Sequence, residues 1–324
     1  MIILKKSLLL LFFVGISLQC FCWGFFAHKK INNHAVFLLP PQMLVFYKSN
    51  IDFLTEHAID PDKRRYAVAG EGSRHYIDID AYGAYPYPDL PRDHSKAIEK
   101  FGEDTINANG IVPWHVQTML GRLTKAFKEN NYSSILKYSA DLGHYIADAH
   151  VPLHASSNHN GQHTDQKGIH GFWESRIPEL LADKEFDFFI GKAQYIPNPG
   201  AFIWDRVLES ALAADSVLKF EKELSIQFRG DKKFGFEKRN LDNLKQVSSD
   251  YSKAFNKKLN GMIERRMRQS IFAVASFWYT AWINAGQPDL ALLSGKSFSE
   301  EDLKGFEELN EKWKNNKVIG REHE

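Results

Sequence analysis

Residues 144–174 of the chain read HYIADAHVPLHASSNHNGQHTDQKGIHGFWE and carry the strongest pattern in the sequence. His144 and Asp148 are four residues apart, so on a helix their side chains lie on one face and can converge on one ion. Pro152 disfavours helical geometry at the preceding residue, so this helix should end near His150. The turn that follows can bring further side chains back toward the same face.

His154 lies just after that turn, and His170 and Glu174 repeat the four-residue spacing on a second element. Imidazole and carboxylate groups from two helices and the turn between them are ligands that zinc takes in proteins, and sites on facing helices are typical of bundles. The histidine content favours zinc over calcium or magnesium. We therefore expect an all-α fold, a multi-helix bundle around a metal cluster with minimal β structure.

Apolar residues recur at helical spacing elsewhere in the chain. The periodicity predicts a helix over residues 113–128 and one long helix over residues 252–284. A capping box opens a charged helix over residues 299–314. The basic segment 229–239 is predicted to be a solvated loop, and residues 75–80 form the one stretch with an extended pattern.

The N-terminus has the layout of a secretory signal peptide. Lys5 and Lys6 precede an apolar run over residues 8–18, and cleavage is expected before Trp23. We therefore expect a secreted or periplasmic protein. The expected ranges are a signal peptide at 1–22, a catalytic domain at 23–290, and a charged C-terminal helix and tail at 291–324.

Both cysteines, Cys20 and Cys22, lie in the expected signal peptide, so packing or metal, and not disulfides, would stabilise the mature chain. Loss of Lys5 and Lys6 with that peptide changes the formal net charge from +1 to −1. A nearly neutral protein has no overall basic field to recruit nucleic acid. A polyanion would have to be drawn by a local feature such as a metal cluster.

Three further candidate ligands precede the opening stretch: His28, Asp60 and His75. With a free amine at Trp23, these residues and the motifs HYIADAHVPLH and IHGFWE resemble the trinuclear zinc phosphodiesterases. That superfamily joins bacterial zinc-dependent phospholipase C with the secreted single-strand-specific nucleases. The resemblance covers residues 23–286 and implies the superfamily's all-α fold and its three zinc ions.

The resemblance implies a ligand set for each ion. The first zinc takes Asp60, His75, His144 and Asp148; the second takes His154, His170 and Glu174; the third takes the amine and carbonyl of Trp23 with His28, and Asp148 bridges to it from the first. Two positions have competitors nearby: Asp62 competes with Asp60, which we favour, and His34 competes with the favoured His28. An α-amine has a pKa near 7.7 to 8.0, so a metal ion displaces its proton easily once cleavage has exposed it. Asp141 and His150 flank the cluster and are candidates to orient its ligands.

The implied reaction is hydrolysis of a phosphodiester by a zinc-bound hydroxide that attacks phosphorus. Asp60 is the candidate to orient or deprotonate the attacking water. The 16-residue step from His154 to His170 and the glutamate at position 174 resemble phospholipase C, which we favour.

Other features resemble the nuclease branch, whose members act as single-strand-specific endonucleases and 3'-nucleotidases. They are the spacing from Trp23 to His28 and the RHYID sequence around His75. A third interpretation, from a different class, is a secreted binding module that zinc stabilises and that turns nothing over.

Tyr82, Tyr85 and Tyr87 lie in a proline-rich stretch and are the candidate substrate residues. They could form a cation–π cage for choline or a stacking platform for a base, so they do not discriminate between the branches. Simple packing of the loop on the surface is the competing interpretation. The expected partner is a phospholipid head group or single-stranded nucleic acid, with peripheral membrane contact and no obligate protein partner.

Overall fold

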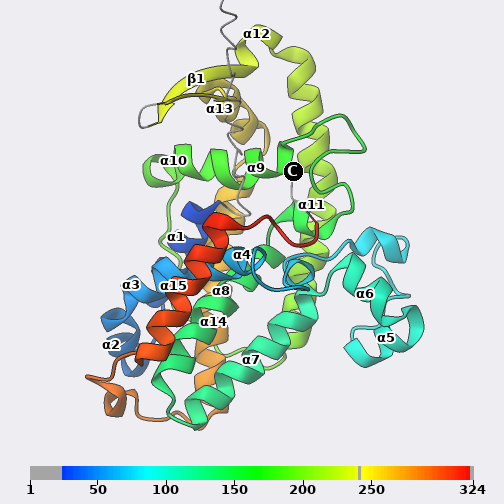
Figure 1. The fold of residues 1–324 in the computed structure, drawn as a ribbon. Coiled ribbons are helices and arrows are strands. Elements are labelled where there is room, and N and C mark those ends of the chain that lie inside the picture. The colour runs from blue at the N-terminus through cyan, green and yellow to red at the C-terminus, as the bar shows by residue number, and fades with distance from the viewer. Residues whose placement is uncertain (1–23, 240–241, 322–324) are drawn as a thin grey trace, which may run out of the picture.

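The computed structural model describes residues 24–239 and 242–321. Helices make up most of this part of the chain, and the one sheet found there is a two-stranded hairpin (Figure 1). The expected all-α fold is confirmed. The expected signal peptide and Trp23 lie outside the described residues. None of the helices in the described ranges is long and apolar enough to cross a membrane.

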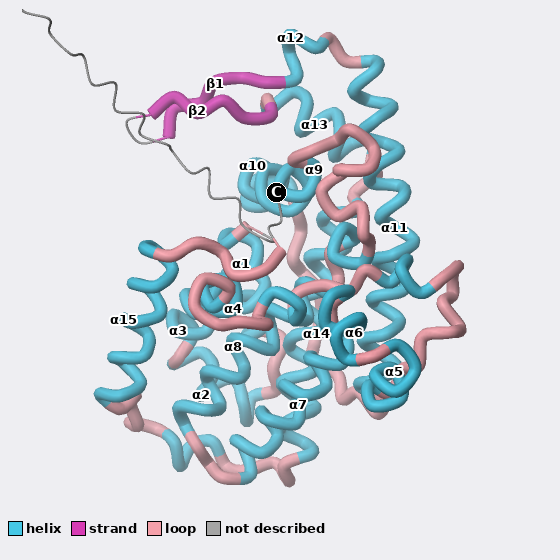
Figure 2. The backbone as a smooth tube through the Cα atoms, turned by 45° about the vertical axis from the view of Figure 1, so that its right-hand side comes forward, coloured by secondary structure: helices cyan, strands magenta, loops and turns pink. Residues whose placement is uncertain are grey.

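Five helices pack together as the centre of the molecule (Figures 1 and 2). They are α1 (Phe25–Val36), α7 (Val112–Lys128), α8 (Tyr132–Ala149), α11 (Pro199–Gln227) and α14 (Met262–Asn284). Helix α14 contacts α1, α7 and α8, and its Trp278 is fully buried. The indole of Trp278 donates a hydrogen bond to the Ser139 carbonyl of α8 at 2.9 Å, which satisfies its polar atom inside the core.

Helices α1 and α8 approach each other closely because α8 has a glycine at the contact. The amide of Asn32 on α1 donates to the carbonyl of Ala140 on α8 at 3.1 Å. A Cβ atom at Gly143 would lie 2.0 Å from Oδ1 of Asn32, so a larger residue there would push the helices apart. Gly143 precedes His144, and Asn32 lies one turn after His28. The contact therefore brings these two histidines together.

Shorter elements surround the central helices. They are α2 (Pro41–Ser49), α3 (Ile51–Glu56), a 3₁₀ turn (His57–Ile59), α4 (Asp60–Arg64), α5 (His94–Phe101), α6 (Glu103–Asn109), α9 (Ile169–Gly171), α10 (Ile177–Glu185), α12 (Gly230–Lys233), α13 (Ser249–Lys258) and α15 (Glu300–Asn315). Helix α15 packs on α4 at the outside of the molecule, and the chain after it turns back across α4 toward α9 (Figures 1 and 2).

Two of the predicted helices are confirmed. Residues 113–128 form α7, and the capping box forms at Ser299, where the side chain accepts from the amide of Asp302. The single helix predicted over residues 252–284 is wrong, because the chain breaks between α13 and α14. Asn260 and Gly261 have φ values of 51° and 71° there, and helical geometry does not continue through such a pair.

The prediction of a loop at residues 229–239 is also wrong. Part of this segment forms β1 (Phe234–Arg239), which pairs antiparallel with β2 (Asp242–Val247). Residues 75–80, in contrast, form no strand. The backbone there is held by single hydrogen bonds to other loops, including one from the Ile77 amide to the His154 carbonyl at 2.8 Å.

Candidate metal centre

Three groups of histidine and carboxylate side chains meet inside the molecule, and each group could hold a metal ion. Within each group the ligand atoms lie within 4.8 Å of one another, and every member is buried. The groups are His28 with His144 and Asp148; Asp62 with His75 and His144; and His154 with His170 and Glu174. His144 belongs to the first two, and Nδ1 of His154 in the third lies 4.0 Å from Oδ1 of Asp148, so the groups form one continuous cluster.

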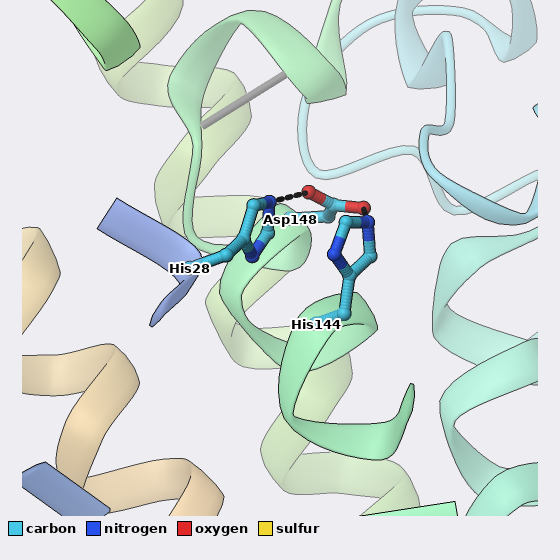
Figure 3. A group of neighbouring side chains, drawn as sticks. All are labelled: His28, His144 and Asp148. Atoms are coloured by element: carbon cyan, nitrogen blue, oxygen red, sulfur yellow. Dashed lines mark ion pairs between the residues drawn. The ribbon is translucent and has the colours of Figure 1, made fainter. Parts of the chain in front are cut away.

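Asp148 lies between the imidazoles of the first group (Figure 3). Its Oδ1 atom is 3.4 Å from Nε2 of His28, and its Oδ2 atom is 3.3 Å from Nε2 of His144. Oδ2 also lies 3.0 Å from Nδ1 of His75. The two oxygens of one carboxylate thus face different sets of histidines, which is the arrangement that a bridging carboxylate needs.

The structure places Asp62, and not the expected Asp60, in the group with His75 and His144. Two residues apart on a helix point roughly 200° apart, so only one of the two aspartates on α4 can face the cluster. Asp60 faces the other way, with Oδ2 2.6 Å from Nδ1 of His57 and Oδ1 3.0 Å from Nζ of Lys63. It lines a hollow of about 600 Å³ bounded by α15.

His154, His170 and Glu174 form the third group, at the end of the molecule that carries α9. His170 lies in α9, and Glu174 lies in a π-helical segment (Phe172–Arg176) that leads into α10. The Nε2 atoms of the two histidines are 3.2 Å apart, and Oε2 of Glu174 is 3.1 Å from Nε2 of His170. The expected helix over this stretch is therefore present but irregular.

Contacts outside the cluster fix the ring orientation of three of these histidines. The Nδ1 atoms of His144, His154 and His170 lie 2.8, 2.5 and 3.0 Å from backbone carbonyl oxygens, those of Ala58, His75 and His159 respectively. A ring whose Nδ1–H donates to a carbonyl leaves Nε2 with its lone pair for a metal. The rings are thus oriented for ligation before any ion binds.

Several ligand atoms are buried and make no hydrogen bond within the protein. They are both oxygens of Asp62 and of Glu174, Oδ1 of Asp148 and both nitrogens of His28. Burying such atoms without partners costs about 1 to 3 kcal/mol each. Their number in one place fits a cation bound among them, and the mixture of imidazole and carboxylate fits zinc.

The charges in the cluster perturb one another strongly. Burial would raise the pKa of Asp148, but His144 and His154 hold it well below its usual range. Burial would lower the pKa of His75, but Asp148 and Glu71 raise it to about 9. Without a metal, the cluster therefore holds protons on histidine to balance its carboxylates.

A second layer of charged groups, which the sequence alone did not reveal, stands behind His75. Oε1 of the fully buried Glu71 lies 3.7 Å from Nε2 of His75. Glu71 also accepts from the hydroxyl of Tyr145 and pairs with Arg64, which in turn binds Asp141 at 2.9 Å. The expectation that Asp141 flanks the cluster is met through this chain of contacts. Glu71 stands four residues before His75 in EGSRH, the same spacing as His144 and Asp148, but the glycine and serine between them give no apolar helical pattern that would draw attention to the pair.

The tyrosines expected to contact substrate do not form a common exposed site. Tyr82 and Tyr87 are buried in the hydrophobic core, at 5% and 8% exposure, whereas Tyr85 is half exposed. The ring of Tyr82 packs on Phe101 at 5.0 Å between centroids. Neither a cation cage nor a stacking platform is built from all three, because two of the rings are occupied by packing.

The expected ligand Trp23 lies outside the described residues, but its neighbour Gly24 is described. A Cβ atom added to Gly24 would lie 2.6 Å from Oγ of Ser175, the residue after Glu174. The chain thus enters α1 beside the third group. His28 follows one turn later and reaches Asp148.

The chain was compared with protein-family models and with curated proteins. No family model matches it, and no curated protein shows a significant match.

Proposed function

We propose that the protein is a secreted zinc-dependent phosphodiester hydrolase of the phospholipase C type. One observation carries the proposal: three groups of histidine and carboxylate ligands lie buried side by side, two of them sharing His144 and the third reaching Asp148 through His154, and each group has buried ligand atoms without a hydrogen bond. Clusters of two or more cations are typical of enzymes that cleave phosphate esters, because the cations clamp the oxygens on both sides of phosphorus. The resemblance to the trinuclear zinc phosphodiesterases points the same way.

Three zinc ions would be held by the groups as the structure has them, with the amine of Trp23 completing the set around His28. Bound zinc would place positive charge beside the phosphate oxygens and would lower the pKa of a water molecule to about 7. Asp148 keeps two of the groups at a fixed separation. Asp62 faces the cluster beside His75 and His144, whereas Asp60 faces away from it toward His57. Asp62 therefore replaces Asp60 as the candidate base.

The substrate assignment follows the loop between His154 and His170. This loop is short and compact, because Oδ1 of Asn160 accepts from the amide of Gly168 at 2.8 Å and Gln166 donates to the carbonyl of Leu218. A short loop beside the third group, together with glutamate at position 174, favours a phospholipid head group. The nuclease alternative keeps its support from the Trp23 to His28 spacing.

The test uses the mature protein beginning at Trp23 and loaded with zinc. Hydrolysis of bis(p-nitrophenyl) phosphate measures the general activity, and phosphatidylcholine and single-stranded DNA measured in parallel distinguish the branches. We expect faster turnover of the lipid. Preference for DNA would assign the nuclease branch, and a fully zinc-loaded protein that hydrolyses none of the three substrates would be a binding module.

Two variants on α8 provide a matched control for this assay. Asp148→Asn removes the bridging charge and should lower turnover by at least about 100-fold, as expected for loss of a transition-state charge contact. Asp141→Asn changes the same residue type two turns earlier, on the side that faces Arg64. Because Asp141 reaches His75 only indirectly, through Arg64 and Glu71, this variant should keep its zinc and lose far less activity than Asp148→Asn.

A further inference from the structure

The ligands of the candidate centre come from two kinds of segment. Five of them lie within the stretch 144–174, whose helices and turns hold them locally. The other three, His28, Asp62 and His75, lie on separate segments earlier in the chain, the nearest of them 69 residues before His144. Contacts outside the ligands themselves must therefore hold these three segments against the stretch 144–174.

The C-terminal residues 313–321, here called the C-terminal clamp, contact all three of those segments. At its start, the ring of Trp313 packs on Phe25, the first residue of α1, at 5.5 Å between centroids. Nζ of Lys63, the residue after Asp62, lies 5.9 Å from the centre of the same indole. The clamp thus meets the α1 segment and the α4 segment at one side chain.

Farther along, the clamp pairs with the backbone that follows α4. The amide of Ile319 donates to the carbonyl of Arg65 at 2.8 Å, and the guanidinium of Arg65 donates to the carbonyl of Arg321 at 2.6 Å. The side-chain amide of Asn316 donates to the carbonyl of Tyr66 at 3.1 Å. These contacts hold the clamp along the chain three to four residues after Asp62.

Arg321 then joins the clamp to the segment that carries His75. Its Nη1 atom donates to Oδ2 of Asp78 at 2.6 Å, and its guanidinium lies 4.0 Å from the centre of the Tyr76 ring. Both side chains of the ion pair are largely buried, at 19% and 12% exposure. Figures 1 and 2 show this part of the chain crossing α4.

We propose that the C-terminal clamp supports the metal centre, and that Arg321 is a positioning residue which holds the segments of Asp62 and His75 in register. The inference rests on the metal centre of the proposed function. It gives a role to residues beyond the part of the chain that resembles the zinc phosphodiesterases, where only a charged helix and tail at 291–324 are expected from the sequence.

The experiment compares the full mature chain with a chain ending at Lys312 and with the variants Arg321→Gln and Arg321→Lys. Cobalt binding is followed by absorbance, and Glu174→Gln identifies the signal of the third group. Truncation and Arg321→Gln should weaken binding at the Asp62 and His75 group by about 10- to 100-fold, as for other outer contacts of ligands. Binding at the third group should weaken less, because one of its three ligands, His154, bonds to the His75 segment, whereas His170 and Glu174 lie on α9 and the π-helical segment.

Two matched controls separate positioning from general damage. Lys314→Gln removes one positive charge from α15 without touching the ligand segments, since the ion pair that Lys314 makes among the described residues is with Glu311, and it should bind cobalt normally. Arg321→Lys keeps the charge beside Asp78 but loses the planar contact with Tyr76, and should recover part of the affinity. Normal cobalt binding by both the truncated chain and Arg321→Gln would overturn the proposal.

Hydrogen exchange of the metal-free proteins gives a readout that needs neither activity nor metal. Loss of the clamp should speed exchange of the amides of Ile77 and Asp78 and leave the central amides of α14 unchanged. Equal exchange in the full and altered chains would show that the clamp does not position the His75 segment, and it would leave the proposed function standing. A full chain that binds metal but hydrolyses no phosphodiester would contradict the proposed function and leave the role of the clamp standing.

Discussion

His75 and His144, which are 69 residues apart in sequence, meet with Nδ1 of His75 3.0 Å from Nε2 of His144. Each ring turns its other nitrogen outward, His75 to Glu71 and His144 to the carbonyl of Ala58. Two ring nitrogens that face each other so closely can share one proton or coordinate one cation, but they cannot each carry a proton. Metal and proton therefore compete for the same place.

Metal binding should release a proton at neutral pH. Burial would lower the pKa of His75, but Asp148 and Glu71 raise it to about 9, so the metal-free protein holds this proton at pH 7. Zinc affinity should then fall about tenfold for each unit that the pH drops below 9, for each proton displaced. Calorimetry in two buffers of different ionisation enthalpy counts the protons. A count of zero at pH 7 would contradict this description of the centre.

Asp62→Asn and Asp60→Asn should differ, although both change the same residue type on α4. Asp62→Asn removes a ligand and should release an ion on dialysis against a weak chelator. Asp60→Asn loses contacts with His57 and Lys63, both outside the cluster, and should keep its full metal content. Metal analysis of the two dialysed proteins decides, and loss from Asp60→Asn alone would restore the expectation from sequence.

Gly143→Ala should weaken the metal group that contains His28. The added Cβ would lie 2.0 Å from Oδ1 of Asn32, so α1 must move away from α8 and carry His28 with it. We expect a destabilisation of about 1 to 3 kcal/mol, as for overpacking in other cores, with loss of one ion. Ala140→Gly, one turn earlier on α8, leaves the contact open and serves as the control. Full metal content in Gly143→Ala would show that the close approach is dispensable.

His115 should make the protein less stable in mild acid. Burial, followed by the charge of Arg74, lowers the pKa of His115 to about 3. Below about pH 6.5 the unfolded chain takes up a proton on His115, and the folded chain does so only near pH 3. Protonation therefore favours the unfolded state, and the free energy of unfolding decreases as the pH falls from about 6.5 toward 3. The loss at pH 5 relative to pH 7 amounts to about 2 kcal/mol.

Chemical denaturation of the wild type and His115→Gln at both pH values isolates that contribution. His115 packs edge-on against Tyr145 at 4.5 Å between centroids, so the variant loses some packing at both values. This packing loss is the same at both pH values, so it cancels when the change in the free energy of unfolding between pH 7 and pH 5 is compared for the two proteins. If the free energy of unfolding changes equally in both proteins between pH 7 and pH 5, the pKa of His115 is not lowered in the folded protein, and the prediction is wrong.

The part of the site that could be predicted from sequence is the part built by local geometry. His144 and Asp148 share a face because they lie on one helix, and Pro152 ends that helix at the residue expected, His150. The return of His154 follows from the same turn. Spacing alone was enough here, since each relation spans only a few residues.

The choice between Asp60 and Asp62 could not be read from spacing. Both lie on a helix of five residues, and the rotation of that helix is set by what packs on its other side. Helix α15, more than 200 residues later in the chain, covers that side. The partner of the His144 ring has the same origin: the carbonyl of Ala58, 86 residues earlier, is brought in by tertiary packing and carries no pattern of its own.

The break between α13 and α14 was missed for a related reason. Apolar periodicity continues across it, but Asn260 and Gly261 both adopt left-handed geometry. Asparagine and glycine tolerate that geometry better than other residues, which permits a break without requiring one. In the sequence, the Asn260–Gly261 pair is therefore a weaker indication of a break than the apolar periodicity is of a continuous helix.

The π-helical segment at Glu174 has a consequence for anyone who would improve this protein. Deleting one residue between His170 and Glu174 would allow an unbroken α-helix with better backbone hydrogen bonding, and such a change would ordinarily count as stabilising. It would also rotate the carboxylate by about 100° relative to His170 and remove it from the third group. Here the irregular turn is the feature to preserve, and selection for thermal stability in metal-free medium would favour its loss.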